Sequence, residues 1–218
     1  MRVLITGATR GIGRALRDAY AEAGEDVIGT CRGAKPGAGR WVRLGVADPA
    51  AQAAMAADLA GEAIDLLVCN AGVYLDKGQS LETGYPAQMW ADTFATNVAG
   101  VFLSVQSLLP NLRAARAAKI AIISSTMASQ ENAPGGSYIY RASKAAVLNV
   151  GRNLARDLQP DGIAVGIYHP GWVQTDMGGA GASITVDESR DGLMARFADL
   201  SIAKSGVFEN WDGRPHPF

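Results

Sequence analysis

Short apolar runs alternate with longer segments of mixed character along this chain. The apolar runs occupy residues 2–6, 26–31, 41–44, 65–69, 119–124 and 163–169. Their hydrophobic character is nearly continuous instead of changing at every second residue, as strands buried on both faces of a parallel sheet require. We therefore predict an α/β chain in which helices cover both faces of a parallel sheet.

The segments between these runs carry helical signals. Ile12, Leu16 and Tyr20 recur every four residues, and Gly24 supplies a stop after them. Further helices are predicted over residues 49–61, 86–115 and 137–158, the last one ending before the helix-breaking residues 160–162. The segment 86–115 is long enough to contain a bend.

The length and composition fit one domain. The 218 residues are 48% hydrophobic, which is enough for a sizeable core. Residues 33–40 and 178–182 are rich in glycine and small side chains, and we interpret them as loops instead of a linker between domains. Residues 1–218 are thus expected to form a single domain.

Charge and cysteine content argue against several classes of protein. The 20 Lys and Arg nearly balance the 21 Asp and Glu, so nothing favours a nucleic-acid or membrane partner. The apolar stretch at residues 3–5 is too short for a signal peptide or a membrane span, and the cytoplasm is the expected location. Cys31 and Cys69 each end an apolar run, which favours core positions. Neither His169 nor His216 has an evident ligand partner, so no metal site is predicted.

A glycine-rich turn, Thr6-Gly-Ala-Thr-Arg-Gly-Ile-Gly13, lies directly between the first strand and the first helix. Such a turn places backbone N–H groups and a helix N-terminus against a pyrophosphate. The alternative is that these glycines only permit a tight turn and close helix packing. The position between a buried strand and an amphipathic helix favours nucleotide binding.

The spacing Gly-x-x-x-Gly-x-Gly resembles that of the short-chain dehydrogenase/reductase family. Five more elements follow in the family's order: Asn70-Ala-Gly72, Asn97, Ser124-Ser125, Tyr140-x-x-x-Lys144, and Pro170-Gly171 with Thr175. The resemblance implies a Rossmann-type doubly wound sheet in the strand order 3-2-1-4-5-6-7 and an oxidoreductase that uses NAD(P). Residues 169–179, 140–144 and 212–215 resemble the C-factor-like branch, which includes sniffer-like carbonyl reductases.

The resemblance also implies roles for individual residues. The catalytic residues would be Asn97, Ser125, Tyr140 and Lys144. The cofactor would contact Gly7, Thr9, Arg10, Gly11, Ile12, Gly13, Arg32, Asn70, Ala71, Gly72, Tyr140, Lys144, Pro170, Gly171, Trp172, Val173 and Thr175.

Tyr140 and Lys144 are four residues apart, so on a helix they share one face. A nearby ammonium and an oxidised nicotinamide both favour the phenolate and would lower the phenol pKa from about 10. Tyr140 would then exchange the proton that accompanies hydride transfer, and Lys144 would also bind the nicotinamide ribose and a relay water held through Asn97. Tyr and Lys at this spacing are common on helices, and it is the order of the motifs that favours catalysis.

Ser125 follows an apolar strand, where its hydroxyl could polarise a substrate oxygen. Ser124 is the competing candidate. The interval from Ser125 to Tyr140 is longer than the family's usual one, which indicates an insertion around residues 131–136.

The end of the second strand bears on the choice of cofactor. Enzymes that use NAD place an acid there for the ribose 2′-hydroxyl, whereas this chain has Thr30-Cys31-Arg32. Guanidinium groups of Arg32 and Arg10 suit a 2′-phosphate, so NADP(H) is preferred and NAD(H) remains possible. Two solvated arginines are the alternative. Gly45 stands where the family commonly has an adenine-binding Asp, and Asp48 is expected to start the next helix.

An apolar substrate pocket is expected around Tyr74, Gln130, Tyr138 and Trp172, with Trp211 nearby, although each of these could simply be packed. The expected substrate is a small or medium aldehyde, ketone or alcohol. The two long helices over residues 86–115 and 137–158 favour a homo-oligomer. A sensor that binds NADP(H) without turnover, or a signalling protein, is the alternative function.

Overall fold

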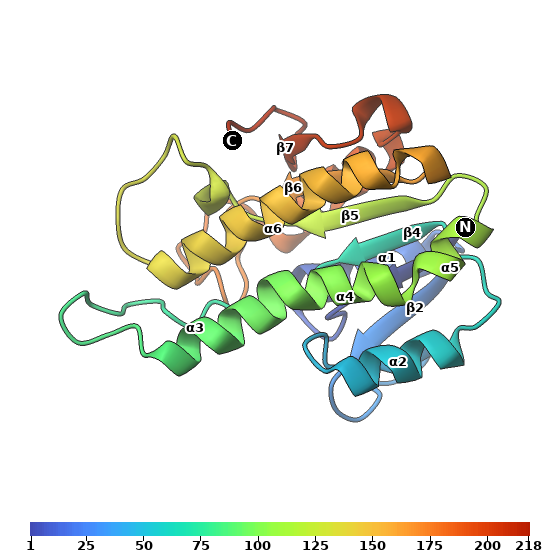
Figure 1. The fold of residues 1–218 in the computed structure, drawn as a ribbon, viewed down its shortest axis with the longest axis horizontal. Coiled ribbons are helices and arrows are strands. Elements are labelled where there is room, and N and C mark those ends of the chain that lie inside the picture. Colours follow the sequence, from blue (N-terminus) through green and yellow to red (C-terminus); the bar gives the residue numbers. More distant parts are fainter.

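The computed structural model describes residues 1–218 and contains one sheet of seven parallel strands (Figure 1). The strand order is β3-β2-β1-β4-β5-β6-β7, as the family resemblance predicts. The strands are β1 (Arg2–Ile5), β2 (Asp26–Cys31), β3 (Arg40–Arg43), β4 (Leu66–Cys69), β5 (Lys119–Ile123), β6 (Ala164–His169) and β7 (Phe208–Asn210). The order reverses its direction beside β1, so the ends of β1 and β4 form the switch point where open α/β sheets bind ligands.

Seven α-helices connect the strands. They are α1 (Gly11–Glu22), α2 (Pro49–Asp58), α3 (Ala87–Phe94), α4 (Gly100–Ser107), α5 (Leu109–Ala114), α6 (Tyr138–Asp157) and α7 (Val186–Asp199). None of them has the length and apolar character needed to cross a membrane.

The predicted helix over residues 86–115 is divided. A π-helix, η1 (Ala95–Ala99), separates α3 from α4, and α4 ends two residues before Leu109 begins α5. Pro110 explains the second break, because it lacks the N–H that a continuous helix needs and is tolerated only in a first turn. Residues 86–115 thus form consecutive helices instead of the single helix that was predicted.

Two elements near the C-terminus were not assigned ranges from the sequence. Helix α7 starts with a capping box, in which Thr185 and Glu188 bond each other's backbone N–H, and this Thr-x-x-Glu signal was readable in the sequence. Strand β7 has only three residues, too few for a periodic pattern. Strand β2 has its predicted bounds, β3 begins and ends one residue earlier than predicted, and the other four strands differ by one residue at one end. Helix α2 stops three residues early.

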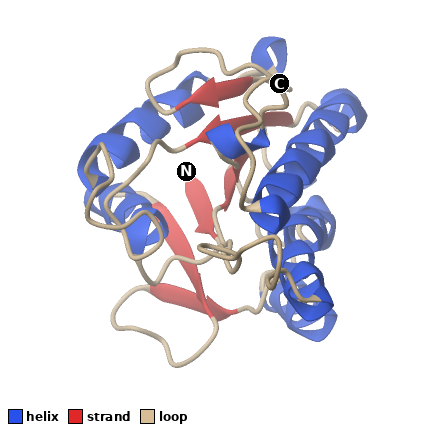
Figure 2. Cartoon of the chain, turned by 90° about the vertical axis from the view of Figure 1, so that its left-hand side faces the viewer, coloured by secondary structure: helices blue, strands red, loops and turns tan.

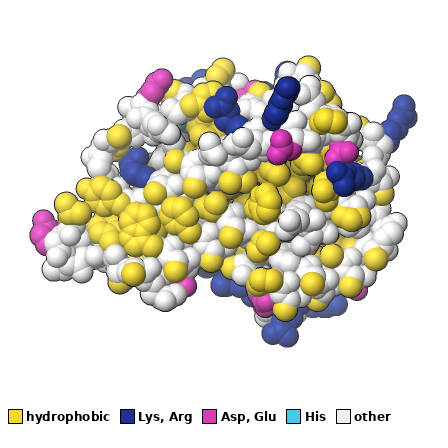
Figure 3. All heavy atoms as spheres, in the orientation of Figure 1, with side chains coloured by type: hydrophobic (Ala, Val, Ile, Leu, Met, Phe, Trp, Pro, Cys, Tyr) yellow, Lys and Arg dark blue, Asp and Glu magenta, His cyan; other side chains and the backbone are white.

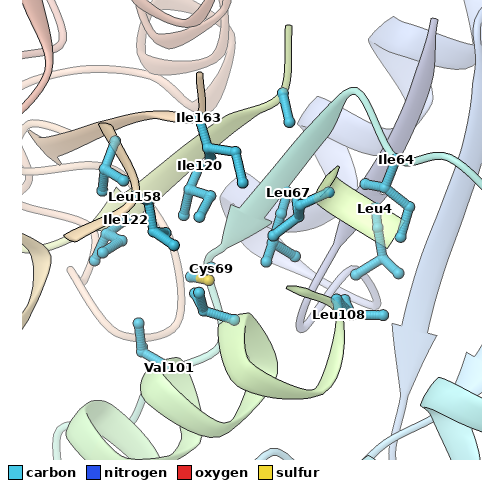
Figure 4. Close-up of a cluster of buried hydrophobic side chains, with 14 of the residues drawn as sticks. Leu4, Ile64, Leu67, Cys69, Val101, Leu108, Ile120, Ile122, Leu158 and Ile163 are labelled. Atoms are coloured by element: carbon cyan, nitrogen blue, oxygen red, sulfur yellow. The ribbon is translucent and has the colours of Figure 1, made fainter. Parts of the chain in front are cut away.

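Helices lie on both sides of the sheet and enclose two separate cores (Figure 2). One core joins the sheet to α2, α4, α5 and α6 and includes Met55, Val101, Leu112 and Val147. Figure 4 shows part of it, with Val101 and Leu108 facing Leu67, Cys69 and Ile120 of the strands. The second core holds α1 and α7 against the opposite face through Leu16, Leu193 and Phe197.

Candidate active site

Three loops that are far apart in the sequence meet at the carboxyl ends of β1, β4 and β6. A Cβ added at Gly7 would lie 3.0 Å from the Ala71 Cα, and one added at Gly11 would lie 3.5 Å from the Thr175 methyl group. The glycine-rich turn therefore contacts both the segment 70–72 and the segment 170–175. The segments that were predicted to bind one cofactor are brought together.

The glycine-rich turn depends on its glycines for its shape. Gly7 and Gly11 have φ angles of 68° and 53°, in the left-handed region that favours glycine. Gly13 packs so closely on Gly7 and Asn70 that a side chain there would overlap both. The tight-turn explanation is thus correct for these positions, and it is compatible with nucleotide binding because the same turn brings backbone close to a ligand.

Asn70, which directly follows β4, holds this turn in place. Its Nδ2 donates to the carbonyl oxygens of Thr6 at 3.0 Å and Gly7 at 3.2 Å. The Thr6 hydroxyl oxygen in turn accepts from the N–H groups of Asn70 and Ala71, both at 3.0 Å. The side chain of Asn70 thus acts on the turn, and Ala71 and Gly72 present backbone at its edge.

The two arginines expected at the cofactor lie in solvent-exposed positions at the same edge. Arg32 is exposed at the end of β2, and Arg10 is exposed in the glycine-rich turn beside Thr9. Arg10 Nη1 lies 3.2 Å from the Asp176 carboxylate, in the loop after β6. Exposed guanidinium groups next to a left-handed glycine turn fit a cofactor that carries several phosphates.

The loop after β6 is held by its own hydrogen bonds. The Pro170 carbonyl accepts from the Ser189 hydroxyl at 2.6 Å, and Gly171 has a φ of 90°. Val173 is buried, while Trp172 is 56% exposed and donates its indole N–H to the Gly178 carbonyl at 2.9 Å. The Thr175 hydroxyl accepts from the Gly178 N–H at 3.1 Å, so this loop forms a compact unit facing the turn.

Tyr140 and Lys144 lie on the same face of α6, as their spacing predicts, and both are buried. Lys144 Nζ lies 5.6 Å from the Tyr140 ring centroid and donates to the Ile123 carbonyl at 2.9 Å. A Cβ at Gly72 would lie 3.7 Å from the same Nζ, which places Lys144 at the edge of the cofactor segment.

Burial dominates the titration of both groups. It raises the pKa of Tyr140, with Tyr74 and Asp76 acting in the same direction, while the neighbouring Ser125 hydroxyl lowers it. Burial also lowers the pKa of Lys144 to about 8. Burial thus has the largest effect on the phenol in the chain alone, and the lowering of its pKa by Lys144 together with an oxidised nicotinamide stays a prediction. Burial therefore favours the protonated form of the Tyr140 phenol.

The structure separates the two candidate serines. The Ser124 hydroxyl donates to the Lys144 carbonyl at 3.2 Å and faces the backbone of α6. Ser125 lies beside the Tyr140 phenol, and its Oγ accepts from the Met127 N–H at 3.1 Å. The geometry favours Ser125, and the insertion over residues 131–136 is an exposed loop that leaves this contact intact.

Asn97 is buried in the π-helix η1. Its Oδ1 accepts from the Val73 N–H at 2.8 Å, and its Nδ2 donates to the Val73 carbonyl at 2.9 Å and the Ser143 hydroxyl at 3.0 Å. Both amide hydrogens are thus used within the chain, and the side chain joins η1 to the segment after β4 and to α6. A relay water at Asn97 stays a prediction.

The residues that were predicted to contact the substrate have different surroundings in the structure. The Tyr74 ring stacks on the Tyr140 ring with centroids 4.2 Å apart, and Tyr138 is 41% exposed at the start of α6. Gln130 donates its backbone N–H to Phe218 at 3.1 Å. Trp211 packs against the second core and is better explained by packing.

One buried carboxylate at this site was not identified from the sequence. Asp76 is 1% exposed and accepts from the N–H groups of Ile139 at 2.9 Å and Tyr140 at 3.2 Å. In the sequence it is a single acid on a loop, which carries no functional signal. Asp48 caps α2 through the Ala50 N–H at 2.9 Å, as expected.

Comparisons with known proteins agree with this arrangement. The model of the short chain dehydrogenase family matches residues 1–183. The C-signal of Myxococcus xanthus is 35% identical over 159 residues, which are 71% of this chain and 93% of that protein.

Two solved structures share the whole fold. An NADPH-bound carbonyl reductase from chicken fatty liver has a TM-score of 0.91 and 31% identity, covering 100% of this chain and 98% of its own. The carbonyl reductase Sniffer of D. melanogaster has a TM-score of 0.91 and 28% identity, covering 100% and 99%. With a family model matched over most of its length, the chain belongs to the short chain dehydrogenase family of oxidoreductases.

Proposed function

We propose that this chain reduces a small or medium aldehyde or ketone with NADPH, and that Tyr140 donates the proton. The observation that carries the proposal is the buried pair of Tyr140 and Lys144 beside Ser125, at the edge where the glycine-rich turn meets residues 70–72 and 170–175. A protonated phenol in a water-poor position is a suitable general acid.

The residues present fit a phosphorylated dinucleotide. Backbone of Gly7–Gly13 and Asn70–Gly72 would hold the pyrophosphate side, and residues 170–175 would orient the nicotinamide ring. Arg10 and Arg32 would recognise the 2′-phosphate, since no acid stands at the end of β2. When bound, the reduced nicotinamide supplies the hydride.

The side chains would then complete the reduction. The substrate carbonyl oxygen would accept hydrogen bonds from the Tyr140 phenol and the Ser125 hydroxyl, which polarise the carbonyl. As the carbonyl carbon gains hydride, the proton passes from the Tyr140 hydroxyl to the substrate oxygen, and an alcohol forms. Lys144 would bind the ribose and stabilise the phenolate that remains. Oxidation of an alcohol is the reverse of these steps.

Tyr74 and Tyr138 supply aromatic surface near the reacting phenol. Because Tyr74 covers one face of the Tyr140 ring and Tyr138 is exposed, a substrate would meet mainly apolar groups beside one hydrogen-bonding centre. This setting suits a carbonyl compound with an apolar substituent. Trp172, exposed on the loop after β6, would contact the cofactor or the substrate from the other side.

A signalling role is a second candidate, and the likeness to the protein named C-signal favours it. A sensor without turnover would be expected to lose Tyr140 or Lys144, and both are present. The catalytic proposal therefore has the stronger support.

The test is a scan of aldehydes, ketones and alcohols with purified protein, in which NADPH absorbance is followed. We expect turnover with NADPH to exceed turnover with NADH, and Arg32→Asp to weaken NADPH binding more than NADH binding. Equal binding of the two cofactors by the wild type at physiological salt would contradict the role of the arginines. Tight NADPH binding with no turnover on any substrate would favour the sensor.

A further inference from the structure

The first turn of α6, which carries Tyr140, has no cap of its own. Ser137 stands at the capping position, but its φ of 47° is left-handed and its side chain makes no capping hydrogen bond. The first N–H groups of a helix need an acceptor, and leaving them unpaired in a buried place is costly. The acceptor must therefore come from elsewhere.

Asp76 supplies it from 63 residues away. Its carboxylate accepts from the Ile139 N–H at 2.9 Å, and both of its oxygens lie within 3.3 Å of the Tyr140 nitrogen. The side chain is 1% exposed, so it is not a solvated acid that happens to be near. A negative charge at a helix N-terminus also interacts favourably with the helix dipole.

The segment that carries Asp76 is itself fixed to the site. Val73 is held on both its N–H and its carbonyl by Asn97. Tyr74 stacks on the Tyr140 ring and its hydroxyl bonds to Ser137. Residues 73–76 thus connect the edge of the cofactor segment 70–72 with both the backbone and the ring of Tyr140.

We propose that Asp76 is a positioning residue: by capping α6 in place of Ser137, it sets the location of the Tyr140 phenol relative to the cofactor segment. This inference rests on the proposed function, because it assumes that Tyr140 is the proton donor. Asp76 is a charged residue that belongs to none of the sequence motifs described above.

The negative charge of Asp76 also affects the pKa of the Tyr140 phenol. The groups that face Tyr140 are Lys144 on α6, Ser125 after β5, and Tyr74 and Asp76 after β4, and the Asp76 carboxylate acts to raise the phenol pKa. Removing only that charge lowers the phenol pKa, whereas removing only the cap does not. The pH profile therefore distinguishes an electrostatic and positioning role from a purely structural one.

The experiment compares Asp76→Asn with Asp76→Ala. Asparagine keeps a capping oxygen and loses the charge, while alanine loses both. We expect Asp76→Asn to keep kcat within about threefold and to move the limb of the kcat/KM profile that reports Tyr140 toward lower pH. We expect Asp76→Ala to lose about tenfold or more in kcat at saturating NADPH, with little change in NADPH affinity.

The matched control is Asp48→Ala, which removes the cap of α2 on another part of the sheet. It should lower the melting temperature as Asp76→Ala does, without lowering kcat at saturating NADPH. An active wild type in which both Asp76 variants keep the wild-type kcat and pH profile would overturn the role of Asp76 and leave the proposed function intact. If Asp76→Ala does not fold, an unchanged pH profile for Asp76→Asn still overturns the inference. A wild type without turnover would overturn both proposals.

Discussion

Burial acts on the two titratable side chains of the site in the same sense, against their charged forms. It favours the protonated form of the Tyr140 phenol and lowers the pKa of the Lys144 ammonium to about 8. A protonated acid beside an amine that titrates near neutrality suits a reaction in which one proton is delivered and later replaced. Tyr140 and Lys144 are proposed to have different roles, so substitutions of the two residues should have different effects on turnover and NADPH binding.

Tyr140→Phe removes the transferable proton and keeps the ring that stacks on Tyr74. We expect carbonyl reduction to fall by about 10²–10⁴-fold while NADPH binding is preserved. Reduction rates from NADPH absorbance and a fluorescence titration with NADPH check this. Near-normal turnover would remove Tyr140 from the mechanism. Lys144→Met is the comparison, because it should reduce both turnover and NADPH affinity.

The Lys144 pKa also predicts how stability depends on pH. Between pH 8 and pH 10.5 the unfolded chain binds a proton on this amine that the folded chain lacks, so its contribution to the free energy of unfolding rises with pH. Below that window the buried ammonium costs stability, on the order of 3 kcal/mol from the size of the shift. Relative to Lys144→Met, the wild type should gain up to this amount as pH rises through the window. Urea unfolding of both proteins at the two ends of the window measures it, and a constant difference would contradict it.

At the scale of elements, the contact between the glycine-rich turn and α1 leaves no room for a side chain. A Cβ at Gly13 would overlap Gly7 and Asn70, whereas one at Gly181 would meet no atom within 4 Å. The turn and the first helix can therefore approach only because Gly13 is glycine.

We expect Gly13→Ala to destabilise the chain by roughly 1–3 kcal/mol, as overpacking does, and to weaken NADPH binding because the turn must shift. Gly181→Ala is the control and should change stability by less than about 0.5 kcal/mol. Chemical unfolding and NADPH titration of both variants provide the measurement. Equal effects of the two substitutions would show that close packing at Gly13 is not what the turn requires.

At the scale of the whole molecule, an apolar surface lies on the same face as helices that carry the site. Figure 3 shows hydrophobic side chains in a band across the face that carries α4 and α6. Trp90, Phe102 and Tyr138 are 37%, 44% and 41% exposed. Large exposed apolar side chains in one area are typical of an interaction surface.

We expect a homodimer or higher oligomer that uses this face. Light scattering at micromolar concentration should give at least twice the chain's mass, and Phe102→Glu should shift the distribution toward the monomer because it places a charge in the contact. A monomer mass for the wild type over that concentration range would contradict the expectation. Secondary structure measured by circular dichroism should be the same for both proteins, which controls for misfolding.

The sequence by itself determined the class of fold, the sheet order through the family resemblance, and the places of the glycine-rich turn, Tyr140 and Lys144. These features rest on local signals: continuous apolar runs, glycines at a strand end, and a four-residue spacing on one helix. The break before Pro110 is of the same kind, since it follows from a missing N–H.

Only the tertiary structure decided the rest. It directed the Ser124 hydroxyl to the backbone of α6 and put Ser125 beside the Tyr140 phenol, because the direction of each hydroxyl depends on how α6 packs on the end of β5. It showed that burial opposes ionisation of the phenol, because desolvation depends on residues that are distant in the sequence. It also showed Asp76 capping α6 across 63 residues, a contact that no local pattern encodes because the two partners belong to different elements of the fold.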